Sequence, residues 1–166
     1  GTGTFAVQIA KAFGAAVTAV CSTRNVEAAR ALGADHVIDY TRQDFTQNAQ
    51  KYDLILAANG YHPLSHYQRV LNEKGRYVVT GGSMRQIFQG MLLGPLKSAF
   101  GKQKFGNLLA KPNGKDLLFL NEWLETGKVR PVVERCYPLS EAAEAMRYVG
   151  DGHARGKIVI SILQGA

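Results

Sequence analysis

Two glycines at the start of the chain, separated by one residue, are the first feature that could do chemistry. Gly1 and Gly3 lead directly into a segment with the apolar spacing of a helix, residues 5–13. The unpaired N–H groups and the positive dipole end make the start of a helix a natural site for phosphate. Glycines there let the backbone approach a pyrophosphate closely. Taken alone, the pair is equally compatible with a flexible start of the chain.

A second polar group follows the next predicted strand. Residues 22–25 read Ser-Thr-Arg-Asn and include no acid. A nucleotide with a free ribose 2′-hydroxyl usually meets Asp or Glu about 20 residues after the glycines. Hydroxyls and a guanidinium suit a 2′-phosphate instead, with Arg24 as the bidentate donor. The alternative is that Ser22 or Asn25 caps the following helix, and both roles can hold at once.

The histidines and cysteines of the sequence indicate neither a metal site nor a catalytic residue. His62 and His66 share a face at i, i+4 spacing, which could hold a metal, but the sequence offers no evident third ligand. We therefore expect no metal. Cys21 and Cys136 are too few for a disulfide framework, which favours a reducing, cytoplasmic setting. No known nucleophile motif occurs, so the catalytic residues stay unknown.

These residues need elements that position them, and strands alternate with helices along the first half of the chain. Short apolar runs predict strands at 16–21, 36–38, 52–57 and 76–80. The spacing of apolar residues and the caps predict helices at 5–13, 26–32, 44–50 and 64–71. Gly14, Gly33 and Gly75 are the expected stops of the first, second and fourth of these helices. This alternation predicts an α/β fold built on a parallel sheet.

The pattern changes after residue 82. We expect a broken helix over 87–100, an edge strand over 104–110, strands at 132–137 and 157–163, and helices at 115–126 and 141–149. Ser140 is the expected cap of the last helix. The helix at 115–126 should turn its large apolar side chains inward: Leu117, Leu118, Leu120, Trp123 and Leu124.

The order of elements also predicts that the sheet lacks the strand that normally precedes the glycine turn. In a nucleotide-binding βαβ unit, the strand before the glycine turn is the central strand of the sheet. Here the glycines come first. The sequence therefore predicts a Rossmann-type doubly wound parallel sheet without its first strand.

Composition narrows the class of partner. The chain has 166 residues and a net charge of +7, with 20 Lys+Arg against 13 Asp+Glu, which is the length of one domain. The basic residues are scattered except for the acid-free stretch 97–115, for which a solvated face, an anionic ligand and a nucleic acid are the alternatives. No apolar run approaches the roughly 18 residues of a membrane span. We expect neither nucleic acid nor membrane as a partner.

Eight motifs carry a resemblance that covers nearly the whole chain. They lie at residues 1–11, 31–40, 52–56, 75–78, 81–83, 109–113, 137–143 and 152–157, and the second reads ALGADHVIDY. In combination they resemble the medium-chain dehydrogenase/reductase superfamily. Within it the chain is similar to the zinc-independent, quinone oxidoreductase-like relatives of alcohol dehydrogenase.

The resemblance implies a fold and an activity. It implies an NADP(H)-binding Rossmann-like domain over 1–156, truncated at its N-terminal edge, and a strand over 157–166 that would return to an absent catalytic domain. The implied activity is NADPH-dependent reduction of a quinone, an enone or a similar carbonyl compound. The alternative is a catalytically inactive, truncated module that acts only in binding or as a dimeric interaction domain.

The resemblance also implies site residues and an assembly. Gly1 and Gly3 would face the pyrophosphate. Other positions would surround the 2′-phosphate (Ser22, Arg24, Tyr40), approach the nicotinamide side (Asn59, Gly60, Gly81, Gly82, Ser83) or lie near the cofactor (Lys157). In relatives of this kind the last Rossmann strand pairs across a two-fold axis. We therefore expect a homodimer through the edge strand Lys104–Ala110.

Overall fold

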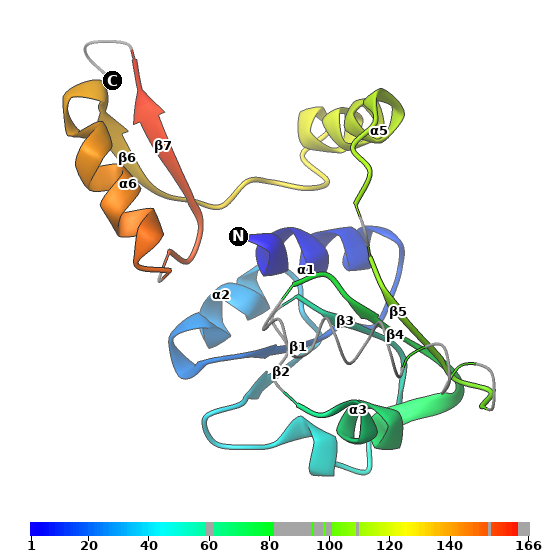
Figure 1. The fold of residues 1–166 in the computed structure, drawn as a ribbon. Coiled ribbons are helices and arrows are strands. Elements are labelled where there is room, and N and C mark those ends of the chain that lie inside the picture. The colour runs from blue at the N-terminus through cyan, green and yellow to red at the C-terminus, as the bar shows by residue number, and fades with distance from the viewer. Residues whose placement is uncertain are drawn as a thin grey trace. The chain divides into compact units, whose positions relative to one another are not determined.

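A computed structural model of the chain describes residues 1–58, 62–81, 94, 98, 101–108, 110–152 and 154–162 (Figure 1). The described elements belong to two compact units. Unit 1 combines Gly1–Thr41 with Asn113–Ala166, and unit 2 is Arg42–Pro112.

The first part of unit 1 is a short parallel strand pair with its helices. In chain order its elements are α1 (Thr2–Ala12), β1 (Thr18–Cys21), η1 (Thr23–Asn25), α2 (Val26–Ala31) and β2 (His36–Asp39). β1 and β2 run parallel, with Thr18 opposite His36 and Cys21 opposite Asp39. The two α-helices are followed by Gly14 and Gly33, whose φ angles of 77° and 96° few other residues adopt. Both glycines stop their helices as the sequence predicts.

Asp35 joins the start of β1 to α1. Its carboxylate accepts a hydrogen bond from the Lys11 ammonium at 2.8 Å and from the backbone N–H of Val17 at 2.7 Å. The Lys11 bond, followed by the Val17 bond, holds the pKa of Asp35 below its ordinary value. The ALGAD motif therefore has a structural role, because its last residue fixes a helix against a strand.

The second part of unit 1 is another parallel pair. Its elements are α5 (Gly114–Glu125), β6 (Val133–Pro138), η3 (Leu139–Glu141), α6 (Ala142–Gly150) and β7 (Lys157–Ser161). β6 and β7 pair in parallel. The buried Gln8 links this part to α1, because its side-chain amide donates to the carbonyl of Arg130 and accepts from the N–H of the same residue.

Unit 2 is a three-stranded parallel sheet. Its elements are η2 (Phe45–Gln47), β3 (Tyr52–Ala57), α3 (Leu64–Val70), β4 (Leu71–Val79) and β5 (Lys104–Asn107), with strand order β3-β4-β5. Four buried rings form its core, and neighbouring centroids lie 4.6 to 6.0 Å apart: Phe45, Tyr67, Tyr77 and Phe105. Burial, then Tyr67, raises the pKa of Tyr77.

The α/β fold with parallel strands is confirmed. Every described strand pairing is parallel, and β5 forms one edge of its sheet as predicted. The described strands form three separate hydrogen-bonded groups, of two, three and two strands. The predicted broken helix over 87–100 falls almost wholly outside the described residues. None of the described helices has the length and apolar character needed to cross a membrane.

The prediction of a helix over 44–50 is wrong. Only one 3₁₀ turn forms, Phe45–Gln47. The Asp44 carboxylate accepts from the backbone N–H and the hydroxyl of Thr46 and from the side chain of Gln47. Such local bonds satisfy the backbone without a helix, which is why the helix does not continue.

The predicted stop at Gly75 is also wrong. β4 begins directly after α3, at Leu71, and runs through Gly75. A Cβ at this glycine would lie 3.0 Å from the carbonyl oxygens of Tyr52 and Asn72. The register with β3 shifts between Tyr52 and Leu54. Gly75 therefore permits a close approach of two backbones inside a sheet, not the end of a helix.

The inward face predicted for 115–126 and the Ser140 cap need correction. In α5 only Trp123 is buried, and Leu117 and Leu118 remain 65% and 72% exposed. The apolar spacing defines a helix face, but it does not supply an element to cover that face. Ser140 lies inside η3, and α6 begins after Glu141 without a side-chain cap.

Candidate cofactor-binding site

The carboxyl ends of β1 and β2 bring together two of the loops singled out from the sequence. Ser22 and Arg24 follow β1, and Tyr40 follows β2. The backbone N–H of Tyr40 donates to the carbonyl of Cys21 at 3.0 Å, so the loops are joined at their base. Adjacent carboxyl ends of parallel strands are where open α/β sheets bind ligands.

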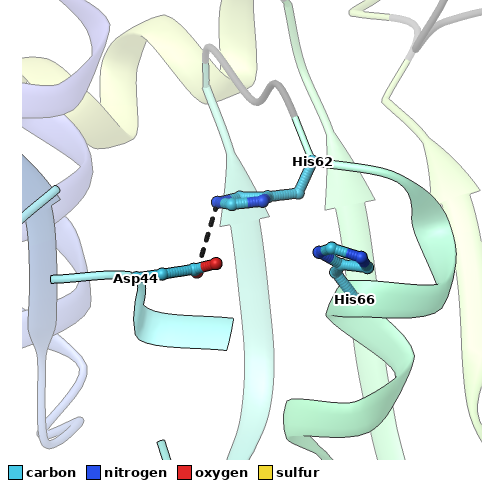
Figure 2. A group of neighbouring side chains, drawn as sticks. All are labelled: Asp44, His62 and His66. Carbon is cyan, nitrogen blue, oxygen red and sulfur yellow. Dashed lines mark ion pairs between the residues drawn. The ribbon is translucent and has the colours of Figure 1, made fainter. Parts of the chain in front are cut away.

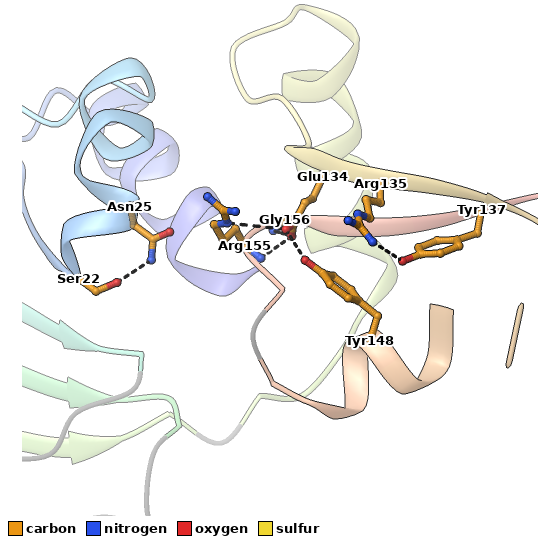
Figure 3. Close-up of polar contacts among 8 residues, drawn as sticks. All are labelled: Ser22, Asn25, Glu134, Arg135, Tyr137, Tyr148, Arg155 and Gly156. Carbon is orange, nitrogen blue, oxygen red and sulfur yellow. Dashed lines mark hydrogen bonds and ion pairs between the residues drawn. The ribbon is translucent and has the colours of Figure 1, made fainter. Parts of the chain in front are cut away.

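Arg24 is the cation of the loop after β1. Arg24 is exposed in η1, and its guanidinium has no hydrogen bond or ion pair with any residue that the structure describes. Ser22 is half-buried, and its hydroxyl accepts a bond from the Asn25 side chain at 3.3 Å (Figure 3). The two residues therefore offer an anion one exposed guanidinium and one oriented hydroxyl.

A carboxylate that the sequence argument did not weigh also stands at this edge. Asp39 ends β2, and its two oxygens accept hydrogen bonds from the hydroxyls of Thr23 and Thr41. It lies opposite Cys21 in the register, and burial followed by the Asp39 charge raises the pKa of the Cys21 thiol. The sequence did show Asp39 as an acid directly after the predicted strand 36–38. The spacing of residues could not show that β2 pairs with β1 and so brings Asp39 to the loop after β1.

The start of α1 leaves room for a ligand. Gly1 is the N-cap residue and Gly3 lies in the first turn. A Cβ built on either glycine meets no atom of the described residues within 4 Å. Packing in unit 1 therefore does not explain the two glycines, whereas close approach of a ligand would.

Lys157 lies near the same helix end. It begins β7, and its ammonium is 5.6 Å from the centroid of the Phe5 ring in α1. Unit 1 thus gathers Lys157 and the first N–H groups of α1, both of which favour an anion.

Glu134 holds the loop that precedes Lys157, and Figure 3 shows its contacts with Tyr148, Arg155 and Gly156. Its carboxylate accepts from the Tyr148 hydroxyl at 2.7 Å and from the backbone N–H groups of Arg155 and Gly156. The Tyr148 bond contributes most to holding the pKa of Glu134 below its ordinary value. Sequence reasoning missed Glu134, because it lies 21 positions from Arg155 and belongs to no recognisable motif.

The remaining predicted positions belong to the second unit or lie outside the description. Gly81 follows β4, and a Cβ there would be 2.8 Å from the carbonyl oxygen of Ala58, so only glycine fits. Asn59, Gly60, Gly82 and Ser83 fall outside the described residues. The nicotinamide side of the predicted site therefore stays a prediction.

Comparison with known proteins gives a consistent set of matches. The family model for zinc-binding dehydrogenases matches residues 32–160. A chloroplast envelope quinone oxidoreductase homolog of Arabidopsis thaliana is 35% identical over 96% of this chain and 49% of its own length. An NADPH-dependent alkenal/one oxidoreductase of the same plant is 34% identical over 96% of this chain and 38% of its own length.

A solved structure agrees with these sequence matches. The quinone oxidoreductase from Coxiella burnetii superposes with a TM-score of 0.80 at 29% identity, over 98% of this chain and 50% of that one. The chain thus spans about half the length of the relatives it matches.

Proposed function

The chain belongs to the zinc-binding dehydrogenases of the medium-chain dehydrogenase/reductase superfamily and is quinone oxidoreductase-like, and on that premise we propose that it binds NADPH. It would act as the nucleotide-binding portion of an oxidoreductase that reduces a quinone, an enone or a similar carbonyl compound. The bound cofactor supplies the hydride. The residues of this chain bind and orient it.

One observation carries the choice of NADPH over NADH. Arg24 is exposed beside Ser22 and has no partner among the described residues, at the strand end where the adenosine ribose binds in folds of this kind. A planar guanidinium can hold a phosphate with two hydrogen bonds. Asp39, one strand away, directs its oxygens to the hydroxyls of Thr23 and Thr41. Arg24 is therefore the group positioned to select a 2′-phosphate.

A second set of contacts supports the pyrophosphate site. The open positions of Gly1 and Gly3 admit a close ligand, and Lys157 adds a positive charge beside Phe5 in the same helix. Together they would place the anionic centre of a dinucleotide against α1.

The order of strands supports the finer proposal for the fold. Doubly wound dinucleotide-binding sheets have strand order 3-2-1-4-5-6. The pair β2-β1 and the triple β3-β4-β5 match the flanks 3-2 and 4-5-6 of that order. We therefore assign the chain to a Rossmann-type sheet in which strand 1 is not among the described strands.

Cofactor binding tests the proposal directly. We expect isothermal titration to give tighter binding of NADPH than of NADH. Arg24→Ala should weaken NADPH binding about 10- to 150-fold, the equivalent of one charge-assisted hydrogen bond of about 1.5–3 kcal/mol. The same variant should leave NADH binding unchanged.

Arg30→Ala is the matched control, because Arg30 lies on α2 and pairs with Glu27 at 2.7 Å, away from the loop after β1. It should leave both affinities unchanged. Equal affinity for the two cofactors, or an Arg24→Ala variant with unaltered NADPH binding, would show that the phosphate site is wrongly assigned.

A binding module without catalysis is the alternative to an enzyme. Turnover of NADPH with a simple quinone distinguishes the two. Oxidation of NADPH by the chain supports the enzyme. A folded chain that binds NADPH but does not oxidise it supports the module.

A further inference from the structure

Unit 2 places a carboxylate beside the histidine pair, and this supplies the third ligand that the sequence lacked (Figure 2). One ligand atom from each of Asp44, His62 and His66 lies within 4.8 Å of the other two. We propose that these three side chains bind a divalent first-row transition-metal ion, with Zn²⁺ as the preferred ion. The site shares no residue with the proposed nucleotide site, and its test does not depend on cofactor binding.

The donor set fits zinc. Two imidazoles and one carboxylate are a recurrent set for Zn²⁺, which forms bonds of about 2.0–2.2 Å in a tetrahedral arrangement. Two ligand atoms on such an ion are about 3.3–3.6 Å apart, by the same bond lengths. The distance from His62 Nε2 to Asp44 Oδ1 is 3.5 Å, which already meets this requirement. Closure of the site needs a movement of the His66 ring, by rotation of its side chain.

The surroundings hold the ligands in place. Asp44 is fixed by the bonds it accepts from Thr46 and Gln47, the kind of outer partners that orient a metal-binding carboxylate. The His62 ring packs edge-on against Phe45 and Tyr67, with centroids 5.6 and 5.9 Å away. Two of the three ligands therefore have restricted orientations before an ion binds.

His66 has a nitrogen that a bound metal would satisfy. The Nδ1 atom of His66 is buried and has no hydrogen-bond partner among the described residues. A buried nitrogen without a partner is costly, and a metal bond would satisfy it.

The fourth position has access to solvent. A cleft of about 780 Å³ in unit 2 is lined by His66 and by residues of η2 and α3, including Thr46 and Arg69. Zinc sites with three protein ligands keep one position for water or another small ligand. Water from this cleft would complete the coordination.

Cobalt spectroscopy and calorimetry test the site in the chain as it stands. The chain, freed of metal with a chelator, is titrated with CoCl₂ and then with ZnCl₂. We expect visible absorption typical of tetrahedral Co²⁺ at one ion per chain, and loss of that absorption when Zn²⁺ displaces the cobalt. His66→Ala removes one of the three ligands. Its Zn²⁺ affinity should fall by at least roughly 10- to 100-fold, which is the loss when only a residue that hydrogen-bonds to a metal ligand is removed.

The control is His36→Ala, because His36 is exposed in β2 and belongs to unit 1. It should bind Zn²⁺ like the unaltered chain. Asp44→Asn keeps an oxygen to cap η2 but removes the charge, so it tests the site even if His66→Ala fails to fold. Absence of 1:1 binding, or equal binding by the Asp44→Asn and unaltered chains, would overturn the proposal.

Discussion

Gly156 shows how tightly single residues are constrained in the loop before β7. A Cβ at this position would lie 2.5 Å from the carbonyl oxygen of Val132 and 3.2 Å from Cβ of Glu134. The same glycine donates its N–H to the Glu134 carboxylate at 3.0 Å. Its small size is therefore required by packing, and the position of Lys157 depends on it.

We expect Gly156→Ala to reduce the free energy of unfolding by about 1–3 kcal/mol, because the added methyl group forces the backbone away from Val132. Urea denaturation measures the change. Gly150→Ala is the control, since a Cβ there meets nothing within 4 Å, and it should be neutral or stabilise by up to about 1 kcal/mol. Equal stability of the Gly156 and Gly150 variants would contradict the packing argument.

At the scale of elements, ionised carboxylates join helices to strands. Asp35 connects α1 to the start of β1 through Lys11 and Val17. Glu134 connects β6 to α6 through Tyr148 and to the loop before β7. Both carboxyl groups have pKa values below their ordinary values because the folded chain donates hydrogen bonds to the charged form. These junctions should therefore be sensitive to acid.

The sign of the pH effect follows from the lowered pKa of Asp35. Its contribution to stability is complete above the unfolded-state pKa of about 3.9 and is lost as the pH falls through the lower folded-state pKa. We expect Asp35→Asn to be less stable than the unaltered chain at pH 7, with the difference shrinking below about pH 4. Thermal denaturation across this pH range measures the effect.

Asp151→Asn serves as the matched control, because the Asp151 side chain has no hydrogen bond or ion pair within the described part of the chain. Its stability should follow that of the unaltered chain at every pH. A constant difference between Asp35→Asn and the unaltered chain down to pH 2 would contradict the assignment.

At the scale of the whole molecule, we propose that two copies of the chain form a homodimer by pairing along β5. This strand forms one edge of the unit 2 sheet. Leu108 donates its backbone N–H to Val79 on β4, so by strand alternation the N–H of Asn107 points to the outer edge. At Phe105 the Ser98 hydroxyl accepts the outward N–H at 2.9 Å. Asn107 also has a contact within the chain, so pairing across the edge would have to replace or accommodate the contacts of both residues.

Asn107→Pro tests this interface. Proline removes an outward N–H and is tolerated on an edge strand, so pairing with β4 should survive while pairing with a second copy is lost. We expect sedimentation analysis to give a dimer for the unaltered chain and for Asn107→Ala, and a monomer for Asn107→Pro. A monomeric unaltered chain, or a dimeric proline variant, would refute the proposed interface.

Much of the fold could be predicted because the signals are local. The predicted strand over 52–57 matches β3, and Gly14 and Gly33 stop their helices as expected. A run of β-branched residues or a glycine after a helix acts within a few residues, and its effect depends little on the rest of the chain. The family, too, was evident from short motifs, such as residues 31–40, and the comparisons confirm it.

The candidate sites could be predicted only in part. Spacing placed Ser22 and Arg24 at a strand end, because a strand and its following loop are neighbours in sequence. Spacing could not place Asp39 opposite Cys21, since strand register is decided by pairing. The positions of Asn59, Gly60, Gly82 and Ser83 in the site remain predictions.

The sequence by itself determined the class of fold, the family and the positions of most strands and helices. Only the tertiary structure decided which side chains meet, as when Asp44 reaches His62 and His66, and which apolar faces stay exposed, as on α5. The physical reason is that periodicity defines the face of one element, whereas contacts depend on the register and packing of elements far apart in the chain.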